Sequence, residues 1–250
     1  MWLSEPLNLS LSHDLNLLPK IPRLEADDLH LFCLPRVAFE SQALELHYLE
    51  GLSLEEKERA RSIKNTESRE AFIQSRARLR WFLGHQLEIP PVEVPLAIGP
   101  YGKPHLRSKE IEFNLSHTQG LILIGMARGV ELGVDVEQRR PTRRLDALIQ
   151  EVFSIRERPW FMGLAEEEQL DLFFRGWALK EAFVKATGRG IAAGLSRVVI
   201  REDFQGFEAI PEGDPLDYQV FESAFSSTRI ALVHRGEIRT IRYYQGSFES

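Results

Sequence analysis

The stretch from residue 111 to residue 137, IEFNLSHTQGLILIGMARGVELGVDVE, decides the fold. Apolar and polar residues alternate at its start, which predicts a half-buried strand over 111–116. A turn and a fully apolar run then predict a strand over 121–127, and a second turn leads into a strand over 132–137. Because the connections are short, the three strands are expected to form an antiparallel meander.

Helical signals precede these strands. An apolar run predicts a short strand over 29–34, well before the helices begin. Ser53 and Glu56 form a capping box, which predicts a helix running to about Lys64. Apolar residues at helical spacing predict a second and longer helix over about 67–87.

Helical signals also follow the strands. A helix is expected at about 142–151. A second capping box at 154–157 predicts the start of another helix, which Pro159 limits or kinks. A long helix is expected from about 166 to 186, with Gly188 just past its end. The remainder should form short strands, at 197–200, 207–210, 217–221, 229–233 and 240–244.

Composition and this order of elements are typical of an α+β or an α/β fold, and we take α+β as the prediction. Each half of the chain has a strand, a long helix and further strands, which is a faint sign of internal duplication. Residues 1–27 contain three prolines and no clear period, so they are expected to be a mostly irregular arm.

Composition excludes several classes of protein. The 250 residues carry a net charge of −6, which argues against a strongly basic nucleic-acid binder. A single cysteine, no apolar run of membrane-spanning length and no basic leader predict a cytoplasmic protein that does not enter a membrane. Residues 57–80 nevertheless carry a charge of +5, which is either a solvated helix face or an attraction for phosphate or an acidic partner.

Two carboxylates follow each other on one strand face. Period two places Asp135 and Glu137 on the same side of the strand over 132–137. Such a pair is suited to Mg²⁺, which prefers oxygen ligands and keeps positions for water and phosphate. An exposed strand face is the alternative interpretation.

The long helix carries a polar stripe. Trp177, Glu181 and Lys185 are spaced four residues apart and lie along one drifting line. A core tryptophan beside an ordinary Glu–Lys surface pair would explain the pattern. The helix is otherwise apolar, however, so its few polar residues are expected to have a role.

Two turns offer cations for a phosphate. His117 closes a strand directly after Ser116, where it either binds phosphate or bonds to the turn backbone. Pro104 holds Lys103 in an extended conformation, which can direct its ammonium group, although a plain surface turn has the same sequence.

Five segments in a fixed order resemble the 4′-phosphopantetheinyl transferases of the surfactin-synthetase-activating (Sfp-like) type. The glycine-aspartate-glutamate strand and the Trp-x-x-Lys-Glu helix, about 40 residues apart, form that family's signature pair. The resemblance runs from about Leu29 onward, and the last 50 residues match only in strand pattern. The five segments are G-K-P (102–104), N-L-S-H (114–117), G-V-D-V-E (133–137), F-S-x-x-E (153–157) and W-A-L-K-E-A-F-V-K-A-T-G-R-G (177–190).

The resemblance implies an enzyme that moves the phosphopantetheine arm of coenzyme A to a serine of an apo acyl or peptidyl carrier protein. Adenosine 3′,5′-bisphosphate is released, and Mg²⁺ or Mn²⁺ is required. It also implies two similar α/β subdomains packed as a pseudo-dimer in a monomeric chain. The corresponding division is an arm at 1–28, an N-terminal subdomain at 29–130 and a C-terminal subdomain at 131–250.

The resemblance also implies roles for single residues. Asp135, Glu137 and Glu181 would hold the metal, with Glu181 alternatively acting as general base, and Lys185 would bind the pyrophosphate or protonate the leaving group. The remaining candidates would surround the coenzyme: Lys103, Ser116 and His117 at the nucleotide, Arg69 or Arg76 at a phosphate, Lys57 or Arg61 as a further contact, and Lys180 as a residue that shapes the site.

Overall fold

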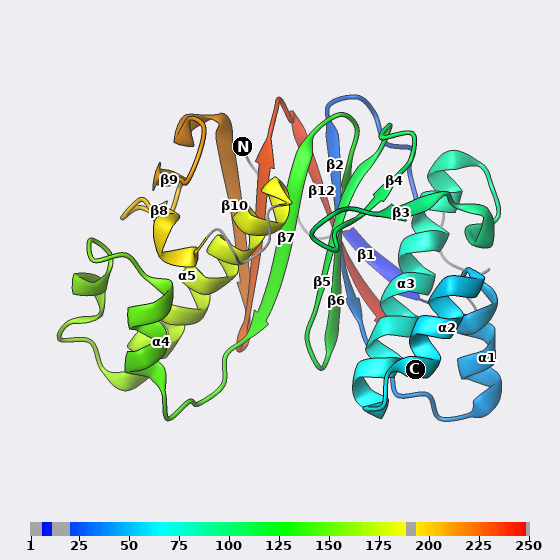
Figure 1. Ribbon diagram of the computed structural model, residues 1–250, viewed down its shortest axis with the longest axis horizontal. Helices are drawn as coiled ribbons and strands as arrows, with labels where there is room; N and C mark the ends of the chain where they lie inside the picture. Colours follow the sequence, from blue (N-terminus) through cyan, green and yellow to red (C-terminus); the bar gives the residue numbers. More distant parts are fainter. Residues whose placement is uncertain (1–6, 12–20, 189–193, 249–250) are drawn as a thin grey trace.

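The computed structural model describes residues 7–11, 21–188 and 194–248. Two sheets stand face to face at the centre, and helices cover their outer faces (Figure 1). The α+β class is therefore confirmed. The larger sheet has the order β1-β12-β2-β6-β5, and the smaller has the order β10-β11-β7. Their bounds are β1 (Leu7–Leu11), β2 (Asp28–Pro35), β5 (Glu112–His117), β6 (Leu121–Ala127), β7 (Glu131–Gln138), β10 (Tyr218–Phe225), β11 (Thr228–Arg235) and β12 (Thr240–Phe248).

The meander prediction is half right. β5 and β6 pair antiparallel as expected, but β7 is hydrogen-bonded to β11 in the other sheet. The reason is that β7 turns its apolar face onto the face of β6. Gly125 of β6 leaves the space for this, since a Cβ there would lie 2.8 Å from Val134 Cγ1 and 3.0 Å from Leu132 Cδ1. The buried residues between the sheets form one continuous core.

Helices pack on the outer face of each sheet. The two long helices were predicted almost to the residue, as α3 (Thr66–Leu87) and α5 (Glu166–Thr187), and Gly188 ends α5 with φ +66°. The capping box also begins α2 (Leu54–Ser62) as expected. α3 shares a core with the five-stranded sheet, and α5 shares a second core with the three-stranded sheet.

Other elements depart from the sequence pattern. α1 (Gln42–Glu50) was not predicted, and the helix expected at 142–151 is the shorter α4 (Leu145–Val152). The capping box at 154–157 begins no α-helix, and only the 3₁₀ turn η3 (Arg158–Phe161) follows it, with Pro159 in its first turn. The remaining short elements are η2 (Pro91–Glu93), β3 (Leu96–Ile98), β4 (Pro104–Leu106), η5 (Leu195–Arg197), β8 (Val199–Ile200), β9 (Phe207–Ala209) and η6 (Pro215–Asp217).

Strands from both ends of the described chain join the larger sheet. β1 falls within the region expected to be irregular, and it pairs parallel with β12. β12 in turn pairs parallel with β2, so the last predicted strand lies in the sheet of the first half. The division into subdomains at residue 130 remains a prediction. No helix in the described part of the chain is long and apolar enough to cross a membrane.

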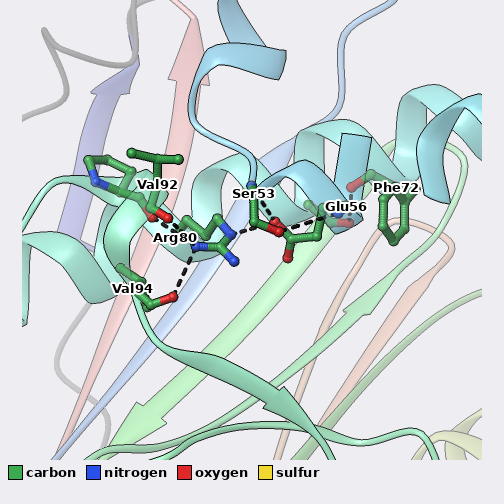
Figure 2. A network of polar contacts seen from close by, with 8 residues as sticks. Ser53, Glu56, Phe72, Arg80, Val92 and Val94 are labelled. Atoms are coloured by element: carbon green, nitrogen blue, oxygen red, sulfur yellow. Dashed lines mark hydrogen bonds and ion pairs between the residues drawn. The ribbon is translucent and has the colours of Figure 1, made fainter. Parts of the chain in front are cut away.

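A buried arginine ties the small helices to the long one. Arg80 of α3 is 3% exposed and donates to the carboxylate of Glu56, which also completes the capping box at the start of α2 (Figure 2). Its Nη1 donates to the carbonyls of Val92 and Val94, at 3.3 and 3.0 Å. Arg80 is therefore occupied in holding the fold, and it is not free to bind a ligand.

His30 makes the larger sheet sensitive to acid. Its side chain is fully buried on β2, neither ring nitrogen has a hydrogen-bond partner in the described part of the chain, and burial lowers its pKa to about 4. The unfolded chain takes up a proton near pH 6.5, whereas the folded chain resists protonation until about pH 4. The free energy of unfolding should therefore decrease as the pH falls from about 6.5 to about 4, by up to about 3 kcal/mol.

In His30→Phe, urea titrations should show a flatter pH dependence over this range, and His47→Gln on α1 is the control. An unchanged slope in His30→Phe would contradict the prediction.

Candidate active site

The site is built where α5 lies directly on β7. Gly133 permits this approach, because a Cβ there would lie 2.0 Å from the carbonyl oxygen of Ala182 and 2.3 Å from the amide nitrogen of Ala186. Asp135 and Glu137 share the strand face with Gly133 by the two-residue period. The absence of a side chain at Gly133 therefore brings both carboxylates toward the helix.

Ser116 of β5 and Lys185 of α5 both contact Asp135 of β7. Its Oδ1 accepts a hydrogen bond of 2.8 Å from the hydroxyl of Ser116 on β5 and one of 2.6 Å from Nζ of Lys185 on α5. Lys185 Nζ also lies 2.9 Å from Ser116 Oγ. Asp135 is 3% exposed, whereas the Lys185 side chain is 28% exposed. The ion pair thus has a buried anion and a cation that reaches the surface.

The carboxylates near Asp135 are held in an environment that disfavours their charge. Burial, reinforced by the charge of Asp135, raises the pKa of Glu137 to about 7. The same two causes raise the pKa of Glu181 on α5. Oδ2 of Asp135 and Oε1 of Glu181 are buried and have no hydrogen-bond partner among the described residues. Unpaired buried carboxylate oxygens are costly, so these atoms are candidates for a further ligand.

The carboxylate oxygens at this site are suited to a divalent metal, but their present positions do not form a metal site. Asp135, Glu137 and Glu181 offer only oxygen ligands, which Mg²⁺ prefers. Asp135 and Glu181 each have one buried oxygen without a hydrogen-bond partner among the described residues. Within residues 21–188 and 194–248, however, no three acidic, histidine or cysteine side chains converge as a ready set of metal ligands. Lys185 neutralises Asp135 in this state. Metal binding would therefore require these side chains to rearrange.

A pocket of about 400 Å³ opens beside the carboxylates. Its walls include Glu181 and Lys185 of α5 and Lys103 of the turn between β3 and β4. Lys103 Nζ donates to the carbonyls of Leu132 and Ala186, both at 3.2 Å, and burial lowers its pKa. Two ammonium groups in one pocket can bind a polyanion such as a pyrophosphate.

Arg36 and His117 lie together at the end of β5. Desolvation, together with the charges of Arg36 and Lys185, lowers the pKa of His117 and so disfavours its charged form. Arg36 donates to the carbonyl of Thr118 at 2.8 Å, and its Nε has no partner in the described structure. Sequence reasoning missed Arg36. The available signal was its place just after the strand expected over 29–34. The strand pairing that brings Arg36 close to His117 joins segments far apart in the sequence, so it gives no local signal.

Three of the predicted phosphate ligands lie elsewhere. Lys57 and Arg69 line a separate groove between α1, α2 and α3, where Arg69 forms an ion pair with Glu45. Arg76 lies over the ring of Phe72, with 5.7 Å between its guanidinium carbon and the ring centroid. None of these three cations lines the pocket that contains Lys185.

Lys180 is also separate from the pocket. Its side chain is 0% exposed, and its ammonium group bonds to Glu157 and to two backbone carbonyls. With all three N–H groups in use, Lys180 has no donor left for a coenzyme phosphate. Trp177 packs against the core that α5 shares with the three-stranded sheet. Its ring is tilted against that of Phe173, with 5.5 Å between the ring centroids.

Carboxylates beside a pocket that contains Lys103 and Lys185 are suited to binding a phosphate-containing group, and comparison with known proteins identifies the family. The family model of the 4′-phosphopantetheinyl transferase superfamily matches residues 131–233. The chain is 38% identical over 181 residues to the 4′-phosphopantetheinyl transferase HetI of a Nostoc species, a match that covers 70% of this chain and 76% of HetI. The chain therefore belongs to the 4′-phosphopantetheinyl transferase superfamily.

Relatives from Bacillus agree with this assignment. The 4′-phosphopantetheinyl transferase psf-1 of Bacillus pumilus is 31% identical over 137 residues, which is 54% of this chain and 58% of psf-1. The 4′-phosphopantetheinyl transferase Sfp of Bacillus subtilis is 24% identical over 162 residues, or 64% of this chain and 71% of Sfp. The resemblance inferred from the five sequence segments is thus confirmed.

Gly133→Ala tests the contact that builds the site. The added methyl group would overlap the backbone of α5, so α5 must shift away from β7. We expect a loss of stability of several kcal/mol. Gly51→Ala is the matched control, because its Cβ would make only an ordinary contact of 3.7 Å with Tyr48 O. Equal melting temperatures for the two variants would show that α5 and β7 are not in close contact.

Proposed function

We propose that this protein transfers the 4′-phosphopantetheine group of coenzyme A to a serine hydroxyl of an apo acyl or peptidyl carrier protein. The reaction releases adenosine 3′,5′-bisphosphate and depends on Mg²⁺, which Mn²⁺ can replace. The meeting of Asp135, Ser116 and Lys185, beside Glu181 and the pocket of Lys103, carries the proposal. Family membership and the names of HetI, psf-1 and Sfp support it.

The chemistry requires a proton acceptor and stabilisation of charge. The serine oxygen forms a bond to the β-phosphorus of coenzyme A, and the bond from that phosphorus to the bridging oxygen of the pyrophosphate breaks. The leaving bisphosphate keeps the electron pair. Lys185 is positioned to bind the pyrophosphate or to protonate the leaving oxygen. Glu181 acts either as the base for the serine proton or as a metal ligand, and its raised pKa is suited to the role of base.

Asp135, Glu137 and Glu181 would hold the Mg²⁺. When all three are ionised they carry three negative charges, and Lys185 returns one positive charge, so a divalent cation would balance the set. The ion would stabilise negative charge on the pyrophosphate oxygens during transfer. In its absence Lys185 remains the counter-ion of Asp135.

The nucleotide end of coenzyme A is assigned to Lys103, Ser116 and His117, as the family resemblance implies. Arg36 is added to them, because its charge is close enough to lower the pKa of His117. Lys57 and Arg69 are instead proposed for the carrier protein, since they line a separate groove between α1, α2 and α3 whose walls combine apolar side chains with charges of both signs. Arg76 has no assigned contact with either substrate.

Intact-protein mass spectrometry tests the reaction directly. An apo carrier protein incubated with this protein, coenzyme A and Mg²⁺ should gain the mass of one phosphopantetheine group. EDTA should prevent the gain, and excess Mg²⁺ should restore it. If coenzyme A binds but several unrelated carriers gain no mass, the chain is a silent member of its family and the proposal is wrong.

Asp135→Asn and Lys185→Met test the central ion pair. Each should lower the transfer rate by at least about a hundredfold, because each removes a charge from the reacting centre. Asp171→Asn is the matched control, since Asp171 is also an ion-paired aspartate, on α5 with Arg229. Rates are to be compared at a temperature where circular dichroism shows every variant folded. A near wild-type rate in Asp135→Asn would remove Asp135 from the metal set.

A further inference from the structure

Lys180 and Glu157 form an ion pair that is completely shielded from water. Lys180 Nζ lies 2.7 Å from Glu157 Oε2, and both side chains are 0% exposed. Burial lowers the pKa of Lys180 to about 8, against the opposing effect of Glu157. The short distance and complete burial identify the interaction as a closed ion pair between α5 and the turn after α4.

Every polar atom of this pair has a hydrogen-bond partner. Lys180 also donates to the carbonyls of Val152 and Leu195, at 3.1 and 3.3 Å. Glu157 accepts from the amides of Ser154 and Ile200, at 2.7 and 2.9 Å. One lysine and one glutamate thus join three segments: the middle of α5, the end of α4 with the turn after it, and the stretch from η5 to the end of β8. This network uses the full bonding capacity of the ammonium group.

Close packing adds to the network on the same face of α5. Lys180 Nζ lies 4.8 Å from the centroid of the Phe153 ring. A Cβ at Gly176, one turn earlier on α5, would lie 2.5 Å from a carbon of that ring. The helix therefore can neither slide nor rotate here without breaking hydrogen bonds or overlapping Phe153.

The next residue along the helix is Glu181. Successive residues of an α-helix point about 100° apart, so the direction of Lys180 sets the directions of Glu181 and of Lys185. On its other side α5 touches β7 at Gly133. Shifts of about 1 Å at a reacting centre can cost about a hundredfold in rate.

We propose that Lys180 and Glu157 are positioning residues for the transfer reaction, because their buried network fixes the rotation of α5 that brings Glu181 and Lys185 to Asp135. This role rests on the proposed function. A buried ion pair is often no more stabilising than a neutral pair of similar volume. The effect of the pair should therefore appear in the turnover rate more than in stability.

The double variant Lys180→Met/Glu157→Gln tests the role, since it removes both charges together. Removing only one partner would leave a buried, uncompensated charge. We expect the double variant to fold and to keep the KM for coenzyme A within about threefold, while kcat falls at least about tenfold. Arg175→Met/Glu222→Gln removes a partly exposed ion pair from the same helix, and it should keep kcat within about twofold.

The outcomes separate positioning from plain structural support. A folded double variant with wild-type kcat overturns the positioning role. If the double variant does not fold, Glu157→Asp decides, because it keeps the charge but shortens the side chain by one carbon. A folded Glu157→Asp with lowered kcat and unchanged KM supports the proposal, and wild-type kcat overturns it. If the wild-type chain modifies no carrier, the proposed function fails first, and the positioning role fails with it.

Discussion

The contact between α5 and β7 is the constraint on which the rest of the structure depends. At Gly133 the helix backbone lies where a side chain would otherwise be. A strand and a helix at this distance place the carboxylate of Asp135 within 2.6 Å of the ammonium group of Lys185. The same approach carries Glu181 and the end of the helix to the pocket of Lys103. Close packing of backbone thus brings together the elements whose side chains form the site.

Two different kinds of polar burial coexist on α5. At Lys180 every donor is satisfied and water is excluded, which gives a rigid point. At Glu181, and at Asp135 on the facing strand β7, one oxygen each lacks a partner among the described residues, which leaves bonding capacity for a ligand. Lys180 and Glu181 are neighbours in sequence but face different segments of the chain. The helix therefore combines a closed network that resists change with an open one that can accept a ligand.

The sequence predicted the local structure well and the pairing less well. Capping and apolar spacing located α3 and α5 to within one residue at each end, because both signals act within a few residues of the helix termini. The partner of β7 could not be predicted, since it depends on a face-to-face contact at Gly125 that has no local signal. The strand β1 was missed for the same reason: its hydrogen bonds go to a strand more than two hundred residues away.

The site was predictable to a similar degree. Spacing placed Glu181 and Lys185 on one stripe and Asp135 on one strand face, and the structure joins Lys185 to Asp135. Lys180 was expected to shape the site, but its partner could not be predicted, because Glu157 lies 23 residues earlier and outside α5. Arg36 was missed because its nearness to His117 arises from the antiparallel pairing of β2 and β6.

The place of β12 has a consequence for how the chain folds during synthesis. β12 lies between β1 and β2, both of which are made roughly two hundred residues earlier. Until residues 240–248 have left the ribosome, β2 therefore has an open edge and β1 has nothing to pair with. Such distant pairing closes a large loop and slows folding. Removing only this strand would cost the sheet an interior member, a much heavier loss than the trimming of an edge.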